Sequence, residues 1–255
     1  MIELTKPRLI VVDIEGTTTS ITFVKEFLFP YVITNINDYL RKNWNDGSLQ
    51  EDVDLLRKQS LVDLESGSSD VPVIGTEDQS NREAVIQSVV DNVLWQMSAD
   101  RKITALKQFQ GKMWRFGYQC GDIKGHVYSD VPKAITKWTQ ELGIKLCIYS
   151  SGSVLAQKLI FGHSVCGDLT HLIDNYFDTT IGPKVESLSY TKIAETCGLN
   201  PEDIVFITDA AKEAFAAKEA GITAILSIRE GTETLSDDTF RQFPTITSFD
   251  EITFK

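Results

Sequence analysis

The stretch "LIVVDIEGTTTSITF", residues 9–23, decides the fold that we expect. Branched apolar residues fill its first part, as they do in a strand buried on both faces of a parallel sheet. Asp13 and Glu15 follow one residue apart, and Gly16 comes directly after them. Side chains of an extended segment alternate in direction, so Asp13 and Glu15 are expected to point the same way. They would then meet at the carboxyl edge of the sheet, where open α/β sheets bind ligands.

Further apolar runs repeat this pattern along the chain. We expect strands at 9–14, 144–150, 203–208 and 222–228, and a weaker one at 245–249. Helical segments that close on a glycine alternate with them, at 130–143, 153–162, 186–198 and 212–221. This alternation predicts an α/β fold, a Rossmann-like doubly wound parallel sheet with right-handed crossovers.

Residues 16–125 break the alternation and predict a helical insertion after the first strand. One apolar helix face is expected to carry Val85, Val89, Val90, Val93, Leu94 and Met97. The stretch 65–81 has no period and many turn residues, so we interpret it as a surface loop. Gly16 and the glycine-rich stretch 111–125 are the expected hinges. The predicted domains are therefore a core of 1–15 and 126–255, with 16–125 inserted.

Composition excludes several classes of function. The chain has 255 residues and a formal net charge of −11 with no basic run, which argues against a nucleic-acid-binding protein. No apolar window reaches the length of a membrane span, and the N-terminus lacks a signal-peptide pattern. We therefore expect a cytoplasmic protein without a nucleic-acid or membrane partner. The absence of a heptad pattern or a long apolar edge favours a monomer.

The ends of the later strands carry polar groups that match the first pair of carboxylates. Ser150 and Ser151 follow the second strand, and Asp209 follows the third. Lys184 stands on a loop before a helix, where an ammonium would neutralise phosphate oxygens. Clustered carboxylates repel one another, and Mg²⁺ is the hard cation that oxygen ligands favour. These residue types predict a magnesium-phosphate site.

The segments "DIEGT", "YSSGS", the loop of Lys184 and "FITDAAKEAFAAKEAGI" resemble the four sequential motifs of the haloacid dehalogenase superfamily of phosphohydrolases. Within that superfamily, the longer stretches "DIEGTTTSITFVKEFLFPY" and "IYSSGSVLAQKLIFGHS" resemble the enolase-phosphatase family of methionine salvage. Glu15 is specific to this resemblance, because most superfamily phosphatases have Asp there. One departure lies near 227–235, where Glu230 and Thr232 replace the usual turn residues of the family.

The resemblance implies a role for each motif residue. Asp13 would be the nucleophile that forms an aspartyl-phosphate, and Glu15 would be the acid and base for the leaving group and water. Ser150, Ser151 and Lys184 would bind the phosphoryl group. One Mg²⁺ per subunit would be held by Asp13, Asp209 and Glu15, the last through its backbone carbonyl or its side chain.

The resemblance also implies a substrate, a cap and a location. The substrate would be a phosphorylated methylthio diketone, which is enolised and then dephosphorylated to an acireductone. The helical insertion would be the cap domain that excludes water. Members of the family are expected in the cytoplasm and also in the nucleus.

Other interpretations of the same residues stay open. A phosphatase of this superfamily could act on another small phosphate ester, because one scaffold hosts many substrates. A serine hydrolase would use Ser151 or Ser153 with His163 as base, although the Gly-x-Ser-x-Gly elbow is missing. A catalytically silent binding protein would not need Asp13, Glu15, Lys184 and Asp209 together.

Overall fold

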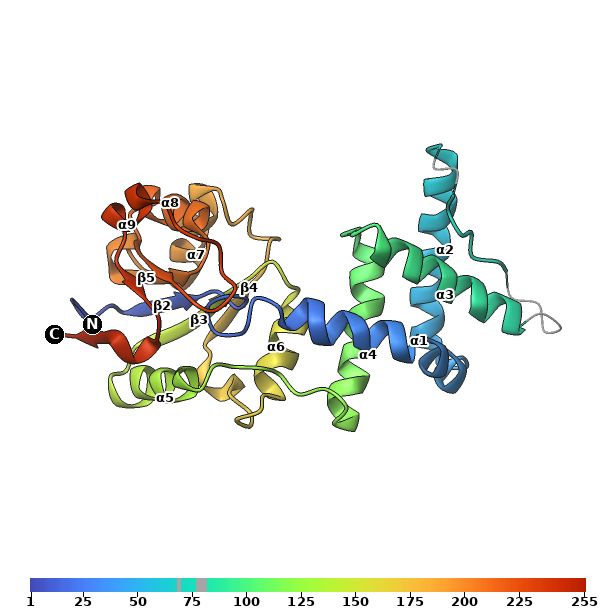
Figure 1. Cartoon of the computed structure of the whole chain (residues 1–255), viewed down its shortest axis with the longest axis horizontal. Coiled ribbons are helices and arrows are strands. Elements are labelled where there is room, and N and C mark those ends of the chain that lie inside the picture. The colour runs from blue at the N-terminus through green and yellow to red at the C-terminus, as the bar shows by residue number, and fades with distance from the viewer. Residues whose placement is uncertain (68–69, 77–81) are drawn as a thin grey trace. The chain divides into compact units, whose positions relative to one another are not determined.

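The structure is a computed structural model that describes residues 1–67, 70–76 and 82–255. It consists of two compact units, shown in Figure 1. The first combines Met1–Val24 with Lys124–Lys255, and the second is Lys25–Ile123. Each unit is therefore described by itself.

A parallel sheet forms the centre of the first unit. Its strands in spatial order are β4 (Asn175–Phe177), β3 (Lys145–Tyr149), β2 (Leu9–Val12), β5 (Ile204–Thr208), β6 (Thr223–Ser227) and β7 (Thr245–Ile246). Within the described residues this is a six-stranded sheet, and every neighbouring pair is parallel. The apolar strand β2 lies between β3 and β5, and its four residues are buried.

Helices cover both faces of this sheet, which confirms the predicted doubly wound fold. Figure 1 shows α7 (Ser187–Cys197), α8 (Ala211–Glu219) and α9 (Asp237–Gln242) on one side. The other side carries α5 (Asp130–Thr136), continued by a π-helical turn at Lys137–Glu141, and α6 (Val154–Gly162). Short 3₁₀ turns stand at Thr170–Leu172, Pro201–Asp203 and Phe249–Glu251.

Alternate residues of the strands pack into the two layers on either side of the sheet. Leu9 and Val11 of β2 join Tyr149 of β3 and Phe206 of β5 in the layer beneath α7 and α8. This layer includes an aromatic group in which the rings of Tyr190 and Phe206 lie 5.1 Å apart. Burial of such side chains removes apolar surface from water and holds the strand ends in place.

Three strands were not expected from the sequence. β4 is short and begins with an exposed polar residue, so it lacks the apolar run that marks a buried strand. β1 (Ile2–Leu4) and β8 (Ile252–Phe254) form a separate parallel pair in which Ile2 lies opposite Ile252. Their pairing joins distant parts of the chain, which local patterns do not report.

The second unit consists of α1 (Phe29–Asn43), α2 (Gly47–Glu65), α3 (Arg82–Ser98) and α4 (Thr104–Cys120), preceded by a π-helical turn at Val24–Leu28. The part of this unit that the structure describes contains no strand. Its core includes Leu40, Trp44, Val53, Leu56, Val89, Val93, Phe109 and Met113. No helix among the described residues is both long and apolar enough to span a membrane.

Two expectations about the insertion differ from the structure. Gly111 and Gly117 lie inside α4 rather than in a hinge, and Gly117 makes room for Tyr31 and Ile123. Of the predicted loop 65–81, residues 68, 69 and 77–81 lie outside the described residues. Its described part does not lie wholly on the surface, because Val71 and Ile74 are buried.

The first unit extends past residue 16, where the insertion was expected to begin. The reason is a set of hydrogen bonds between the outgoing and returning chain. Thr19 Oγ1 donates to the carbonyl of His126 at 2.7 Å, and the Tyr128 N–H donates to the carbonyl of Thr18 at 3.0 Å. Residues 16–24 therefore pack with the sheet.

Candidate active site

The predicted site residues follow three neighbouring strands of the first unit. Asp13 follows β2, Ser150 follows β3, and Asp209 follows β5. Because β3, β2 and β5 are parallel neighbours, their carboxyl ends share one edge of the sheet. Lys184 reaches this edge from the loop between β4 and α7.

Asp13 is buried and strongly held. Its Oδ1 accepts a hydrogen bond from the N–H of Ile14 at 2.7 Å and lies 2.7 Å from the ammonium of Lys184. β2 ends at Val12, so the strict alternation expected for Asp13 and Glu15 ends before them. The carboxylate is therefore oriented by the turn and by Lys184 rather than by strand geometry.

Lys184 joins two carboxylates in a buried network. Its Nζ lies 2.7 Å from Asp13 Oδ1 and 2.8 Å from Glu213 Oε2, and only 9% of its side chain is exposed. Burial alone lowers the pKa of Lys184, but Asp13 and Glu213 outweigh it, and the pKa lies above its ordinary value. The ammonium is therefore a fixed positive charge beside Asp13.

Glu213 was not singled out in the sequence. It stands in the first turn of α8, four residues after Asp209, and Thr208 Oγ1 donates to its Oε2 at 2.7 Å. Burial, with the charge of Asp13, raises the pKa of Glu213. The spacing of the two acidic residues at a helix start was the available signal, since it brings both to one end of α8.

Asp209 lies close to the chain that follows β2. A Cβ atom added to Gly16 would come within 2.4 Å of Asp209 Oδ2, so only glycine fits at this point. Burial first, and then the charges of Asp13 and Glu213, raise the pKa of Asp209 to about 7. The carboxylates of Asp13, Glu213 and Asp209 outnumber the one ammonium of Lys184, which pairs with the first two, and a cation would relieve this excess of negative charge.

The residues of the site must supply oxygen ligands if they are to hold the implied Mg²⁺. Among the described residues, no group of three or more His, Cys, Asp or Glu side chains is arranged to hold a metal ion. The side chains of Asp13, Glu15 and Asp209 thus do not form a complete cage. Asp13 lies near enough to Asp209 for its charge to raise the pKa of Asp209. The two would supply oxygen ligands, and a backbone carbonyl with water would complete the octahedral shell that Mg²⁺ prefers. The residues fit the ion in that form.

The serines occupy different positions. Ser150 is buried, and its Oγ accepts a hydrogen bond from the N–H of Gly152 at 3.4 Å, whereas Ser151 is exposed. Ser153 caps α6, because its Oγ accepts from the N–H of Ala156 at 3.3 Å. The loop thus presents Ser150, Ser151 and the start of a helix, an arrangement that favours an anion.

The serine-hydrolase alternative conflicts with this geometry. Ser153 and His163 cap opposite ends of α6, which has nine residues. At 1.5 Å per residue, the ten steps from 153 to 163 place these positions about 15 Å apart along the helix. A nucleophile and its base must lie within hydrogen-bond reach, so Ser153 and His163 do not form such a pair.

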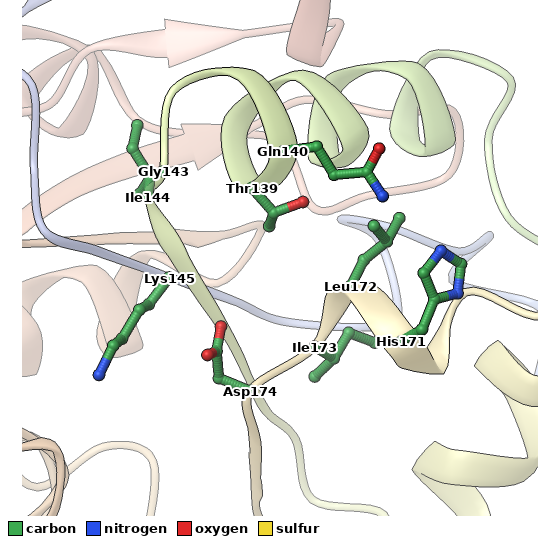
Figure 2. A pocket seen from close by; sticks show the side chains of 9 residues that line it. All are labelled: Thr139, Gln140, Gly143, Ile144, Lys145, His171, Leu172, Ile173 and Asp174. Atoms are coloured by element: carbon green, nitrogen blue, oxygen red, sulfur yellow. The ribbon is translucent and has the colours of Figure 1, made fainter.

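A cavity of about 350 Å³ lies elsewhere in the first unit, at the amino end of β3. Figure 2 shows Gln140 from the π-helical turn and His171 from a 3₁₀ turn above Asp174. Its lining residues are Thr139, Gln140, Gly143, Ile144, Lys145, His171, Leu172, Ile173 and Asp174. None of the predicted site residues is among them, so this cavity and the strand-end carboxylates are separate places.

Comparison with known proteins agrees with the fold and the motifs. A parallel sheet with Asp13, Lys184 and Asp209 at its carboxyl edge defines a hydrolase of the haloacid dehalogenase class, and the family model described as haloacid dehalogenase-like hydrolase matches residues 7–221. Enolase-phosphatase E1 of Danio rerio is 50% identical over 96% of this chain and 94% of its own length. Enolase-phosphatase E1 of Xenopus tropicalis is 53% identical with the same coverage of both chains. The chain belongs to the enolase-phosphatase E1 family.

A solved structure has a similar fold over nearly the whole chain. The crystal structure of the UTR4 protein from Saccharomyces cerevisiae has a TM-score of 0.75 and 28% sequence identity to this chain. The match covers 96% of this chain and 99% of the yeast chain. The resemblance noted in the sequence is thereby confirmed at the level of family and fold.

Proposed function

We propose that this chain is a Mg²⁺-dependent enolase-phosphatase of methionine salvage. Its substrate would be 2,3-diketo-5-methylthiopentyl-1-phosphate, and its products 1,2-dihydroxy-3-keto-5-methylthiopentene and phosphate. The observation that carries the proposal is the buried contact of Asp13 with Lys184, next to Asp209. The family to which the chain belongs supports the choice of substrate.

Asp13 is the nucleophile in this proposal. One oxygen of its carboxylate attacks phosphorus, and the Ile14 N–H and Lys184 orient the carboxylate for this attack. A bond forms between that oxygen and phosphorus while the bond to the substrate oxygen breaks, giving an aspartyl-phosphate. Water then attacks phosphorus and releases phosphate, and Asp13 is regenerated.

Glu15 handles the protons in this scheme. It gives a proton to the departing substrate oxygen and later takes one from the attacking water. Lys184 stabilises negative charge on the phosphoryl oxygens, as Ser150 and Ser151 do through hydrogen bonds. Most of the rate enhancement would come from this positioning and charge.

One Mg²⁺ per subunit would be held by Asp13, Asp209 and the position of Glu15, where the backbone carbonyl is the favoured ligand. When bound, the ion would stabilise charge on phosphoryl and carbonyl oxygens. The excess of the carboxylates of Asp13, Asp209 and Glu213 over the one ammonium of Lys184 supports this choice of cation.

We further propose that the sheet unit is the phosphatase core and the helical unit is its cap, in a monomer of the cytoplasm and nucleus. The helical character of residues 25–123 supports the assignment of the cap. Light scattering would report the mass of the particle. A dimer mass would overturn the monomer without affecting the proposed chemistry.

The test supplies the diketone phosphate and follows enol absorbance and phosphate release together. We expect an enol signal that precedes phosphate, and no turnover by Asp13→Asn at an unchanged unfolding temperature. Phosphate release without an enol would leave a phosphatase for another ester. An active Asp13→Asn protein would contradict the nucleophile.

A further inference from the structure

The loop that follows β2 is fastened to the returning chain at His126. The Ser20 N–H donates to His126 Nδ1 at 3.1 Å, and Thr19 Oγ1 donates to the His126 carbonyl at 2.7 Å. His126 thus binds the loop through both its ring and its backbone. Since Nδ1 accepts, the ring proton lies on Nε2.

The ring of His126 is itself held in place. Its centroid lies 5.1 Å from that of Tyr128, with the planes at 87°, and 6.2 Å from that of Phe23. The guanidinium of Arg229 lies 4.4 Å from the Tyr128 ring centre, and it pairs with Asp130 at 2.7 and 3.2 Å. Arg229 comes from the 227–235 loop, which departs from the family pattern and is anchored here.

The fastened loop leads directly to the candidate site. The Gly16 N–H donates to the Thr19 carbonyl at 2.8 Å, and Glu15 forms a bridge with Thr19. Gly16 in turn is pressed against the carboxylate of Asp209. A displacement of Thr19 would therefore move the Glu15–Gly16 peptide relative to Asp209.

We infer that His126 is a positioning residue that holds Thr19 and Ser20 and thereby keeps the Glu15–Gly16 backbone against Asp209. It acts through these residues and has no contact with the reacting groups in the scheme above. The acceptor role needs a neutral imidazole, and burial lowers the pKa of His126, which keeps the ring neutral at pH 7. The consequence for Mg²⁺ and turnover depends on the proposed function.

Two substitutions separate the acceptor from the ring. His126→Phe keeps an aromatic ring beside Phe23 and Tyr128 but removes Nδ1. His126→Asn places an amide oxygen close to the position of Nδ1 and removes the ring. His171→Phe, at an exposed histidine that lines the separate cavity, is the matched control.

The measurements are hydrogen exchange of the peptide that contains residues 16–23, Mg²⁺ affinity by calorimetry, and kcat with the diketone phosphate. For His126→Phe we expect about tenfold faster exchange at Ser20 and about tenfold weaker Mg²⁺ binding, as for other residues that orient metal ligands indirectly. His126→Asn and His171→Phe should stay within about threefold of the parent protein, a smaller change than such orienting residues give.

The inference is overturned if His126→Phe exchanges and binds Mg²⁺ like the parent. It is equally overturned if His126→Asn loses as much as His126→Phe, since the ring contacts would then matter and not the acceptor. If His126→Phe does not fold, Thr19→Val replaces it, because it removes only the hydrogen bond from Thr19 Oγ1 to the His126 carbonyl. Unchanged hydrogen exchange at residues 16–23 in that variant would reject the role of His126 in holding the loop. If the parent protein lacks Mg²⁺ binding and phosphatase activity, the proposed function fails, while the exchange data still decide on His126.

Discussion

Single residues at the strand ends show how far local sequence reaches. The sequence pointed to Asp13 and Asp209, because charged groups that directly follow buried strands are unusual, and to Lys184 through its loop before a helix. The structure places Asp13 and Lys184 in contact. Glu213 was missed because its orientation depends on the first turn of α8 and on Thr208. The position of Ser20 beside His126 depends on a returning segment far along the chain, which no local pattern reports.

Glu213→Gln tests the network around Lys184. The amide keeps an oxygen for the ammonium but loses the charge that helps to fix Lys184 beside Asp13. We expect kcat to fall by a factor of ten to a hundred, roughly 1.4 to 2.7 kcal/mol of lost transition-state stabilisation. Steady-state kinetics at matched unfolding temperature measures this, and a kcat equal to that of the parent would mean that Asp13 alone positions Lys184.

Helices and strands follow local patterns where they are long and apolar. The strand of residues 9–12 and the helices α5 to α8 were predicted because branched residues and closing glycines mark them, whereas α9 was not. β1, β4 and β8 escaped prediction, since each has three residues and owes its form to a partner strand. Gly117 was expected in a hinge but serves close packing inside α4.

Gly117→Ala should destabilise the helical unit. A Cβ there would come within 2.6 Å of Tyr31 and 2.7 Å of Ile123, which forces a shift of both side chains. We expect a loss of about 1 to 3 kcal/mol in the free energy of unfolding, as for other overpacked sites. The control is Gly47→Ala at the start of α2, where nothing lies within 4 Å and a gain of about 0.5 kcal/mol is expected. Denaturant titrations of both variants measure the difference, and equal effects would refute the packing argument.

The ion pair of Asp63 with Arg101 should make the stability of the helical unit depend on pH. Arg101 donates to both carboxylate oxygens, with one bond of 2.7 Å, and only 9% of the Asp63 side chain is exposed. The hydrogen bonds from Arg101 lower the pKa of Asp63. The stabilisation is therefore present above the unfolded pKa of about 4 and is lost as the pH falls through the folded value.

Asp63→Asn should cost about 2 to 3 kcal/mol at pH 7 and almost nothing well below pH 3, where the parent carboxylate is protonated as well. Unfolding curves at the two pH values test this. The pair of Arg41 with Glu83 serves as a control, since both side chains are more than half exposed, and Glu83→Gln should change stability by less than about 0.5 kcal/mol. A loss for Asp63→Asn that persists at low pH would show that the charge is not responsible.

On the scale of the whole molecule, the two units differ in the interactions that stabilise them. The sheet unit gathers carboxylates at one edge, whereas the helical unit is stabilised by apolar helix faces and a few buried ion pairs. A bound Mg²⁺ is therefore expected to stabilise the sheet unit, where its ligands lie. Anything that binds only the folded state stabilises it in proportion to the logarithm of its concentration.

Magnesium should raise the unfolding temperature of the sheet unit. At about a hundred times its dissociation constant, the ion adds about 2.7 kcal/mol, which corresponds to several degrees for a chain of this size. EDTA should reverse the shift and abolish activity, and added Mg²⁺ should restore both. Calorimetry of the parent and of Asp209→Asn measures the effect, and an equal shift in both proteins would place the ion elsewhere.

The central place of β2 also has a consequence for biosynthesis. Leu9–Val12 leave the ribosome early, yet the two strands that flank them begin at Lys145 and Ile204. At ordinary speeds of translation this delay is on the order of ten seconds, during which the helical unit is finished and β2 has no neighbours. An apolar segment whose two strand edges stay unpaired for this long is expected to bind chaperones of the nascent chain.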